Sequence, residues 1–167
     1  MANTKKNMSR KRNKKILVIV GAMVVILAFV LVIKGAWSST DSNITSDGSL
    51  IIPKIDITAT AKFFPYNVGG TKMEVLAVKA SDGTIRTAFN TCQVCYGSGR
   101  GYYKLDGDIL VCQNCGNRFE PDQVEMQKGG CNPVPIFDED KSDDGQNIVI
   151  TKDYFQQAKE IFSNWKN

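Results

Sequence analysis

The chain contains no histidine at any of its 167 positions. This absence excludes zinc sites with histidine ligands, the two-histidine Rieske centre and the haem attachment motif Cys-x-x-Cys-His. It also removes the usual general base of cysteine hydrolases. The sequence shows no motif for phosphate or nicotinamide binding either, so the functional chemistry must come from other side chains.

The first 34 residues contain no Asp or Glu, although they carry eight of the 21 Lys and Arg residues of the chain. The remaining thirteen basic residues stand against all seventeen acidic ones in residues 35–167, so this larger part is mildly acidic. The positive charge is therefore concentrated in a short tail. Nucleic-acid binding needs a basic stripe on a folded surface, and we do not expect it here.

A run of eighteen residues from Ile16 to Ile33 lacks both charge and proline. As a helix it would span roughly 27 Å, close to the hydrocarbon thickness of a bilayer. Seven basic residues precede the run and one follows it, so the positive-inside rule predicts a single-pass protein of the cell membrane with a cytoplasmic N-terminus. The alternative is a cleaved signal peptide, whose apolar region is usually shorter, about 7–15 residues. The predicted parts are a cytoplasmic basic tail (1–15), a transmembrane anchor (16–34), a polar linker (35–49) and an extracytoplasmic domain (50–167).

The pattern of residues 50–167 predicts a small, mostly β (α+β) domain. Ser81-Asp82-Gly83 and Asp106-Gly107 each separate two strand-like segments, and each predicts a hairpin turn. Thr151 followed by apolar residues at three- and four-residue steps as far as Trp165 predicts a C-terminal helix. The acidic segment 138–146 lacks the spacing of a calcium-binding EF-hand and is predicted to be a solvated loop.

Four of the five cysteines form two Cys-x-x-Cys pairs, Cys92/Cys95 and Cys112/Cys115, with sixteen residues between the pairs. A tight Cys-x-x-Cys turn, or knuckle, places two sulfurs on one side of the backbone, and this separation is typical of zinc ribbons. We therefore predict a two-knuckle metal site of the zinc-ribbon or Rieske-like type. Ligation by thiolates alone suits Zn²⁺, a mononuclear iron, an iron–sulfur cluster or Cu(I).

Other interpretations of the cysteines stay open at this point. Thiols outside the cytoplasm oxidise, so two disulfides and one spare thiol are an alternative to a metal site. Cys131 follows Gly129-Gly130 and could be a ligand, a replacement ligand, a resolving thiol or a plain buried thiol. Met126 could add a thioether ligand for copper, although a Met packed in a core is commoner.

The quoted motifs, together with Gly129-Gly130-Cys131-Asn-Pro-Val-Pro, resemble the FtrD-like membrane iron–sulfur-containing proteins over about residues 50–137. The resemblance implies a membrane-bound iron–sulfur protein with electron transfer in iron handling as its role. It implies Cys92, Cys95, Cys112 and Cys115 as cluster ligands, with Cys131 next. It also implies a membrane partner, either a metal permease or an electron donor.

Three functional hypotheses follow from these residues, and they differ in the chemistry of the site. The first is an electron carrier with an iron–sulfur cluster, which is a non-catalytic role. The second is a binding module in which zinc is purely structural. The third is a thiol-redox or copper-handling protein in which Cys131 or Met126 takes part. Because the same thiolates serve each metal, spacing alone does not choose between them.

Overall fold

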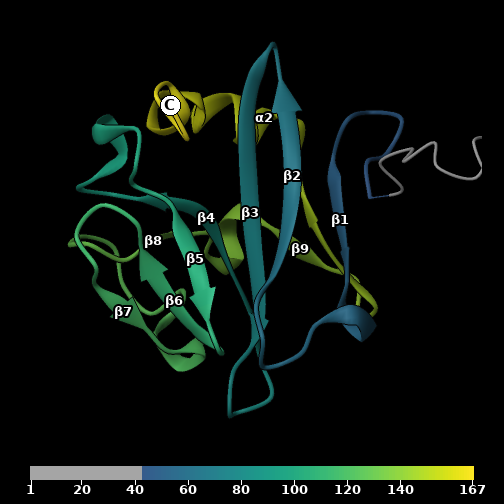
Figure 1. The fold of residues 1–167 in the computed structure, drawn as a ribbon. Coiled ribbons are helices and arrows are strands. Elements are labelled where there is room, and N and C mark those ends of the chain that lie inside the picture. Colours follow the sequence, from purple (N-terminus) through teal and green to yellow (C-terminus); the bar gives the residue numbers. More distant parts are fainter. Residues whose placement is uncertain (1–42) are drawn as a thin grey trace, which may run out of the picture. The chain divides into compact units, whose positions relative to one another are not determined.

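Ten short strands in residues 43–167, the part of the chain that this computed structural model describes, form three antiparallel sheets (Figure 1). The central sheet has the order β2 (Lys62–Val68), β3 (Thr71–Lys79), β4 (Ile85–Cys92), β8 (Pro133–Pro135). A second sheet has the order β1 (Leu50–Pro53), β10 (Asn147–Ile150), β9 (Ser142–Asp143), and a third the order β5 (Tyr103–Asp106), β6 (Ile109–Cys112), β7 (Arg118–Phe119). The mostly β character predicted from the sequence is confirmed.

The helices of residues 43–167 are short. They comprise α2 (Lys152–Gln157) and the 3₁₀ helices η1 (Lys54–Asp56), η2 (Tyr96–Ser98), η3 (Pro121–Gln123), η4 (Asp138–Asp140) and η5 (Lys159–Phe162). No helix of residues 43–167 is long and apolar enough to cross a membrane. The predicted transmembrane anchor, residues 16–34, lies outside the described residues.

The hairpins form at the predicted turns. β3 and β4 pair on either side of Ser81-Asp82-Gly83, where the Asp82 carboxylate accepts a hydrogen bond from the Thr84 N–H (2.9 Å). β5 and β6 pair with Asp106 opposite Ile109, and Gly107 has a φ of +63°. A left-handed residue suits the two-residue turns of hairpins, and Gly adopts it without steric cost.

The central sheet separates two hydrophobic cores. On one side, Val75 and Phe89 pack with the second sheet and with Phe155 of α2. On the other side, Leu76 and Ala88 pack with Leu110 of the third sheet and with the cysteines. Because both faces of β3 are covered, side chains that point to either face are buried along this strand. The cysteine-bearing sheet is thereby packed directly onto the centre of the domain.

The C-terminal segment departs from the single predicted helix. Thr151 caps α2 as expected, its hydroxyl accepting from the Tyr154 N–H (3.4 Å), but α2 ends at Gln157 and a 3₁₀ turn follows. Tertiary hydrogen bonds explain the change. Trp165 Nε1 donates to the Asn90 carbonyl (2.7 Å), and the Lys166 N–H donates to the Gly99 carbonyl (3.0 Å). These bonds hold the last residues against β4 and the first knuckle.

Candidate metal centre

Strand ends place the cysteines. Cys92 is the last residue of β4 and Cys112 the last residue of β6, so each Cys-x-x-Cys begins where a strand stops. β8 pairs with β4, with Pro133 opposite Cys92, and this pairing brings Cys131, two residues earlier, to the same place. The two cysteine pairs and the lone cysteine therefore meet because β4 and β6 end, and β8 begins, at one place.

Asn90 joins the two sheets that carry the knuckles. Its Oδ1 accepts from the Tyr103 N–H (2.7 Å) and its Nδ2 donates to the Tyr103 carbonyl (3.3 Å), as a neighbouring strand would do. Tyr103 is paired with Cys112 in the β5–β6 hairpin, so this buried amide sets the distance between β4 and β6. The Tyr103 hydroxyl donates to the Cys131 carbonyl (2.7 Å) and holds the segment that carries Cys131. From the sequence, Tyr103 is predicted to be an ordinary strand residue near the site, and nothing singles out Asn90, since it belongs to no ligand motif.

Four sulfurs form a compact group. The Sγ atoms of Cys92, Cys95, Cys112 and Cys131 all lie within 4.8 Å of one another. Cys131 Sγ lies 3.3 Å from Cys92 Sγ and 3.6 Å from Cys95 Sγ. Sulfurs around a tetrahedral ion with bonds of about 2.3 Å would lie about 3.8 Å apart, so the spacing is close to that of a single thiolate-bound ion.

Cys115 lies at the outer margin of this group. It is exposed and is not one of the four mutually close thiols, yet its Sγ lies 2.6 Å from that of Cys131. The structure thus brings all five cysteines together and places Cys131 inside the group of four. Which of the five bind a metal stays a prediction.

The electrostatics of the thiols follow burial and local N–H groups. The Cys95 N–H donates to Cys92 Sγ (3.3 Å), the contact that stabilises a thiolate in a knuckle. Burial raises the pKa of Cys112 to about 11. At Cys115 burial acts in the same direction, but hydrogen bonds from Cys131 and the Asn117 backbone outweigh it and lower the pKa to about 7. A free thiolate is therefore easiest to form at the exposed edge.

These donors fit a soft metal group. Five thiols, three of them buried, converge without any imidazole, and knuckle N–H groups point at the sulfurs. Such a donor set matches Zn²⁺, mononuclear iron or an iron–sulfur cluster. All five cysteines are free thiols in this structure.

Gly101 supports the first knuckle by close backbone approach. A Cβ at this position would lie 2.5 Å from the Cys95 carbonyl carbon and 2.7 Å from the Tyr96 nitrogen. The Gly101 carbonyl also accepts from the Cys92 N–H (2.6 Å). The backbone at both ends of the first knuckle, at Cys92 and at Cys95, is thus packed directly against this glycine.

We expect Gly101→Ala to weaken metal binding by roughly tenfold or more, because the knuckle must shift and a group that holds ligands in place is worth about 10–100-fold in affinity. Chelator competition would measure the change. Gly97→Ala is the matched control, since a Cβ there meets nothing within 4 Å and its φ is not left-handed. Equal affinities in the two variants would contradict the supporting role of Gly101.

A buried ion pair holds the segment that leads to Cys131. Glu125 has a left-handed backbone (φ +62°), and its carboxylate accepts from the Thr87 N–H (2.6 Å) and from Lys141 Nζ (2.6 Å). Burial raises the pKa of Glu125, and the Lys141 hydrogen bond opposes that rise. The sequence had predicted a solvated acidic loop at 138–146, but Lys141 within it is buried against Glu125.

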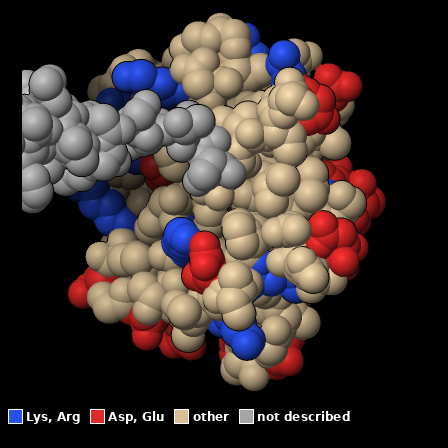
Figure 2. Space-filling model, turned by 90° about the vertical axis from the view of Figure 1, so that its right-hand side faces the viewer, with Lys and Arg blue, Asp and Glu red and all other residues tan. Residues whose placement is uncertain are grey.

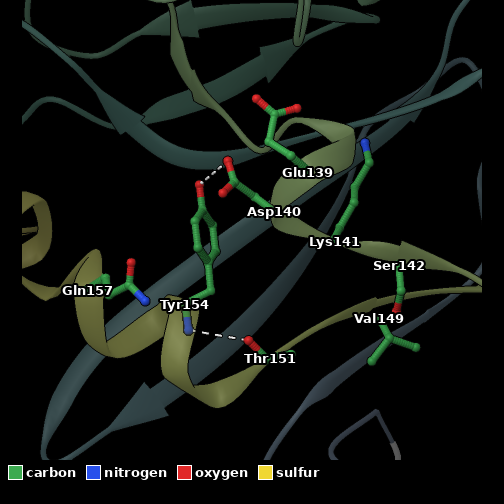
Figure 3. Close-up of a pocket in the computed structure, with 8 residues that line it drawn as sticks. All are labelled: Glu139, Asp140, Lys141, Ser142, Val149, Thr151, Tyr154 and Gln157. Carbon is green, nitrogen blue, oxygen red and sulfur yellow. Dashed lines mark hydrogen bonds between the residues drawn. The ribbon is translucent and has the colours of Figure 1, made fainter.

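Two cavities of the described residues lie away from the cysteines. One, of about 360 Å³, lies between η4, β9, β10 and α2, where the Tyr154 hydroxyl donates to Asp140 (3.0 Å) (Figure 3). Another, of about 270 Å³, is lined by residues 59, 79–81 and 120–122. Neither is lined by a cysteine, so neither serves as a substrate pocket for the metal site.

The charges on the face shown in Figure 2 are mixed. Lys and Arg side chains alternate there with Asp and Glu side chains, separated by large uncharged areas. Elsewhere in the described residues opposite charges are paired, as Lys54 is with Asp143 (2.6 Å) and Lys62 with Asp56 (3.1 Å). The described part of this face offers no continuous surface of one sign.

Comparison with known proteins gives one match. The model of the family described as "Membrane iron-sulfur containing protein FtrD-like" matches residues 57–162, which include all five cysteines. No curated protein and no solved structure matches the chain.

Proposed function

The chain belongs to the FtrD-like family of membrane iron–sulfur-containing proteins, and on this premise we propose that it is a membrane-anchored electron carrier whose cysteine site holds an iron–sulfur cluster. The convergence of five thiols at one edge of the domain carries the proposal. A cluster bound there would accept and donate one electron at a time. The protein would set its potential through N–H···S bonds and burial.

The ligands that we propose are Cys92, Cys95, Cys112 and Cys131, because the mutual distances of their sulfurs favour Cys131 over Cys115 as the fourth ligand. The first three are buried in the second core, and Cys92 and Cys112 are the last residues of β4 and β6. Cys115 and Cys131 lie toward solvent, so the exposed side of the site is the side where electrons can enter and leave. Two of the three large hydrophobic side chains exposed in the described residues, Val94 (68%) and Met126 (62%), belong to the segments around this side.

The membrane placement is part of the proposal. We propose that residues 16–34 anchor the chain as a single span, with residues 1–15 in the cytoplasm and the metal domain outside it. The basic tail before the apolar run supports this orientation. The anchor would keep the domain close to a membrane electron donor or a metal permease. We accordingly propose a role in iron handling, without nucleic acid as a partner.

A second candidate is a mononuclear zinc or iron centre. The observation that favours it is the mutual distance of the four sulfurs, all within 4.8 Å, which suits ligands of one ion. Zinc would make the domain a binding module stabilised by its metal. Mononuclear iron would keep the electron-transfer role.

Metal analysis of the full chain, purified without oxygen, tests the proposal. We expect iron and acid-labile sulfide, with visible absorption that bleaches under dithionite. Iron without sulfide would replace the cluster by a mononuclear centre. A colourless protein that contains only zinc would overturn the electron-transfer function, because zinc has no redox chemistry.

A further inference from the structure

The site contains five thiols, one more than a tetrahedral ion binds. Cys92, Cys95 and Cys112 are buried, so the surplus concerns Cys115 and Cys131, which are exposed and half-buried respectively. Their relation to each other decides what the fifth thiol can do.

Cys115 and Cys131 are too close together to be neighbouring ligands of one ion. Their Sγ atoms are 2.6 Å apart, whereas two sulfurs of a tetrahedral site lie about 3.8 Å apart. The contacts of Cys131 with Cys92 (3.3 Å) and Cys95 (3.6 Å) are nearer to that value. A disulfide has an S–S distance of about 2.05 Å, so an approach of about 0.5 Å would suffice for a covalent bond between Cys115 and Cys131.

The surroundings of the two thiols favour attack from solvent at Cys115. Residues 114–118 are all exposed, so a molecule can reach Cys115 Sγ from outside. Cys131 follows five exposed residues, 126–130, in which Gly129 (φ +95°) and Gly130 (φ +78°) are left-handed and a Cβ on Gly129 would meet no atom within 4 Å. This segment has room for the small shift that a disulfide requires.

We propose that Cys115 and Cys131 form a thiol–disulfide exchange pair that reacts with small-molecule disulfides and thereby releases the metal. The Cys115 thiolate attacks one sulfur of the disulfide, forms a mixed disulfide and expels the first thiolate. Cys131 then attacks Cys115 Sγ, expels the second thiolate and completes the Cys115–Cys131 bond. Two protein thiols lose two electrons and two protons, and one small disulfide becomes two thiols.

Metal release follows from the position of Cys131. Once oxidised, Cys131 is no longer a thiolate and leaves the group of four close sulfurs. Three thiols remain, and they bind a metal more weakly. The inference depends on the proposed function only in that some metal occupies the site.

The test is incubation of the full metal-loaded chain with oxidised glutathione, followed by alkylation, digestion and mass spectrometry. We expect a disulfide that links the peptides containing Cys115 and Cys131, formed together with metal release. A disulfide within one knuckle, Cys92–Cys95 or Cys112–Cys115, would overturn the proposal.

Two variants separate the roles of the pair. Cys115→Ser is expected to be purified with its metal. Oxidised glutathione should then release this metal at least about tenfold more slowly than from the unaltered chain, since the attacking thiol is gone. Cys131→Ser is expected to accumulate glutathione on Cys115, because no thiol resolves the mixed disulfide. A Cys115→Ser protein purified without metal would show that Cys115 is a ligand and would overturn the proposal.

Failure of the exchange pair can be distinguished from failure of the proposed electron carrier. If metal analysis finds zinc instead of iron and sulfide, the electron carrier fails, while the Cys115–Cys131 linkage is still read from the peptides. If the cluster is found but the linkage is absent, only the exchange activity fails.

Discussion

Cys92→Ser is expected to lower the metal affinity of the protein by at least about 100-fold, since even groups that only orient a ligand contribute about 10–100-fold. Cys92 is fully buried, its Sγ lies 3.3 Å from Cys131 Sγ and accepts the Cys95 N–H, and a serine hydroxyl is a poor ligand for a soft metal. Competition with a chelator, read by metal analysis of the retained protein, measures the change.

Cys115→Ser is the matched control for this result, because it makes the same substitution at the exposed margin of the site. We expect it to keep a full complement of metal. Cys92→Ser should also lower the free energy of unfolding, because metal binding contributes directly to folding in sites of this kind. A Cys92→Ser protein that binds metal like the unaltered chain would show that the buried sulfurs are not the ligands.

Lys141→Met is expected to lower the free energy of unfolding by about 3–5 kcal/mol, the cost of leaving one member of a buried ion pair without its partner. The Lys141 and Glu125 side chains are only 5% and 11% exposed, and their closest atoms lie 2.6 Å apart. Methionine fills a similar volume, so the change isolates the charge. Urea denaturation of the metal-loaded protein measures the difference.

Asp138→Asn is the control, because Asp138 also contacts Lys141 (3.5 Å) but its side chain is 96% exposed. We expect a change of no more than about 0.5 kcal/mol for this variant. A Lys141→Met protein as stable as Asp138→Asn would show that the buried pair contributes nothing.

The effect of Lys141→Met should depend on pH. Burial raises the pKa of Glu125, and without Lys141 only the Thr87 N–H opposes the rise. A carboxyl whose pKa is higher in the folded than in the unfolded state stabilises the protein most when protonated. Stability of the variant should therefore increase as the pH falls. Glu125→Gln combined with Lys141→Met removes the charge and should recover part of the loss at neutral pH.

Local chemistry explains what could be predicted from the sequence. Gly83 and Gly107 favour left-handed turn positions wherever they occur, so the two hairpins were predictable from a few adjacent residues. The knuckles are equally local, since Cys-x-x-Cys defines its own turn. Thr151 likewise caps α2 through a hydrogen bond three residues away. The N-terminal anchor is likewise predicted from a local pattern, one continuous apolar run. It lies outside the described residues.

By itself, the sequence determined that thiolates, and no imidazole, would meet in a small, mostly β domain, because composition and short spacings carry that information. Only the tertiary structure decided the rest. Cys131 joins the site through the pairing of β8 with β4, and Cys115 stays at its exposed edge. The last helix ends early because Trp165 and Lys166 bind β4 and the first knuckle. Such contacts join residues tens of positions apart, and no local pattern of side chains specifies which partner each will find.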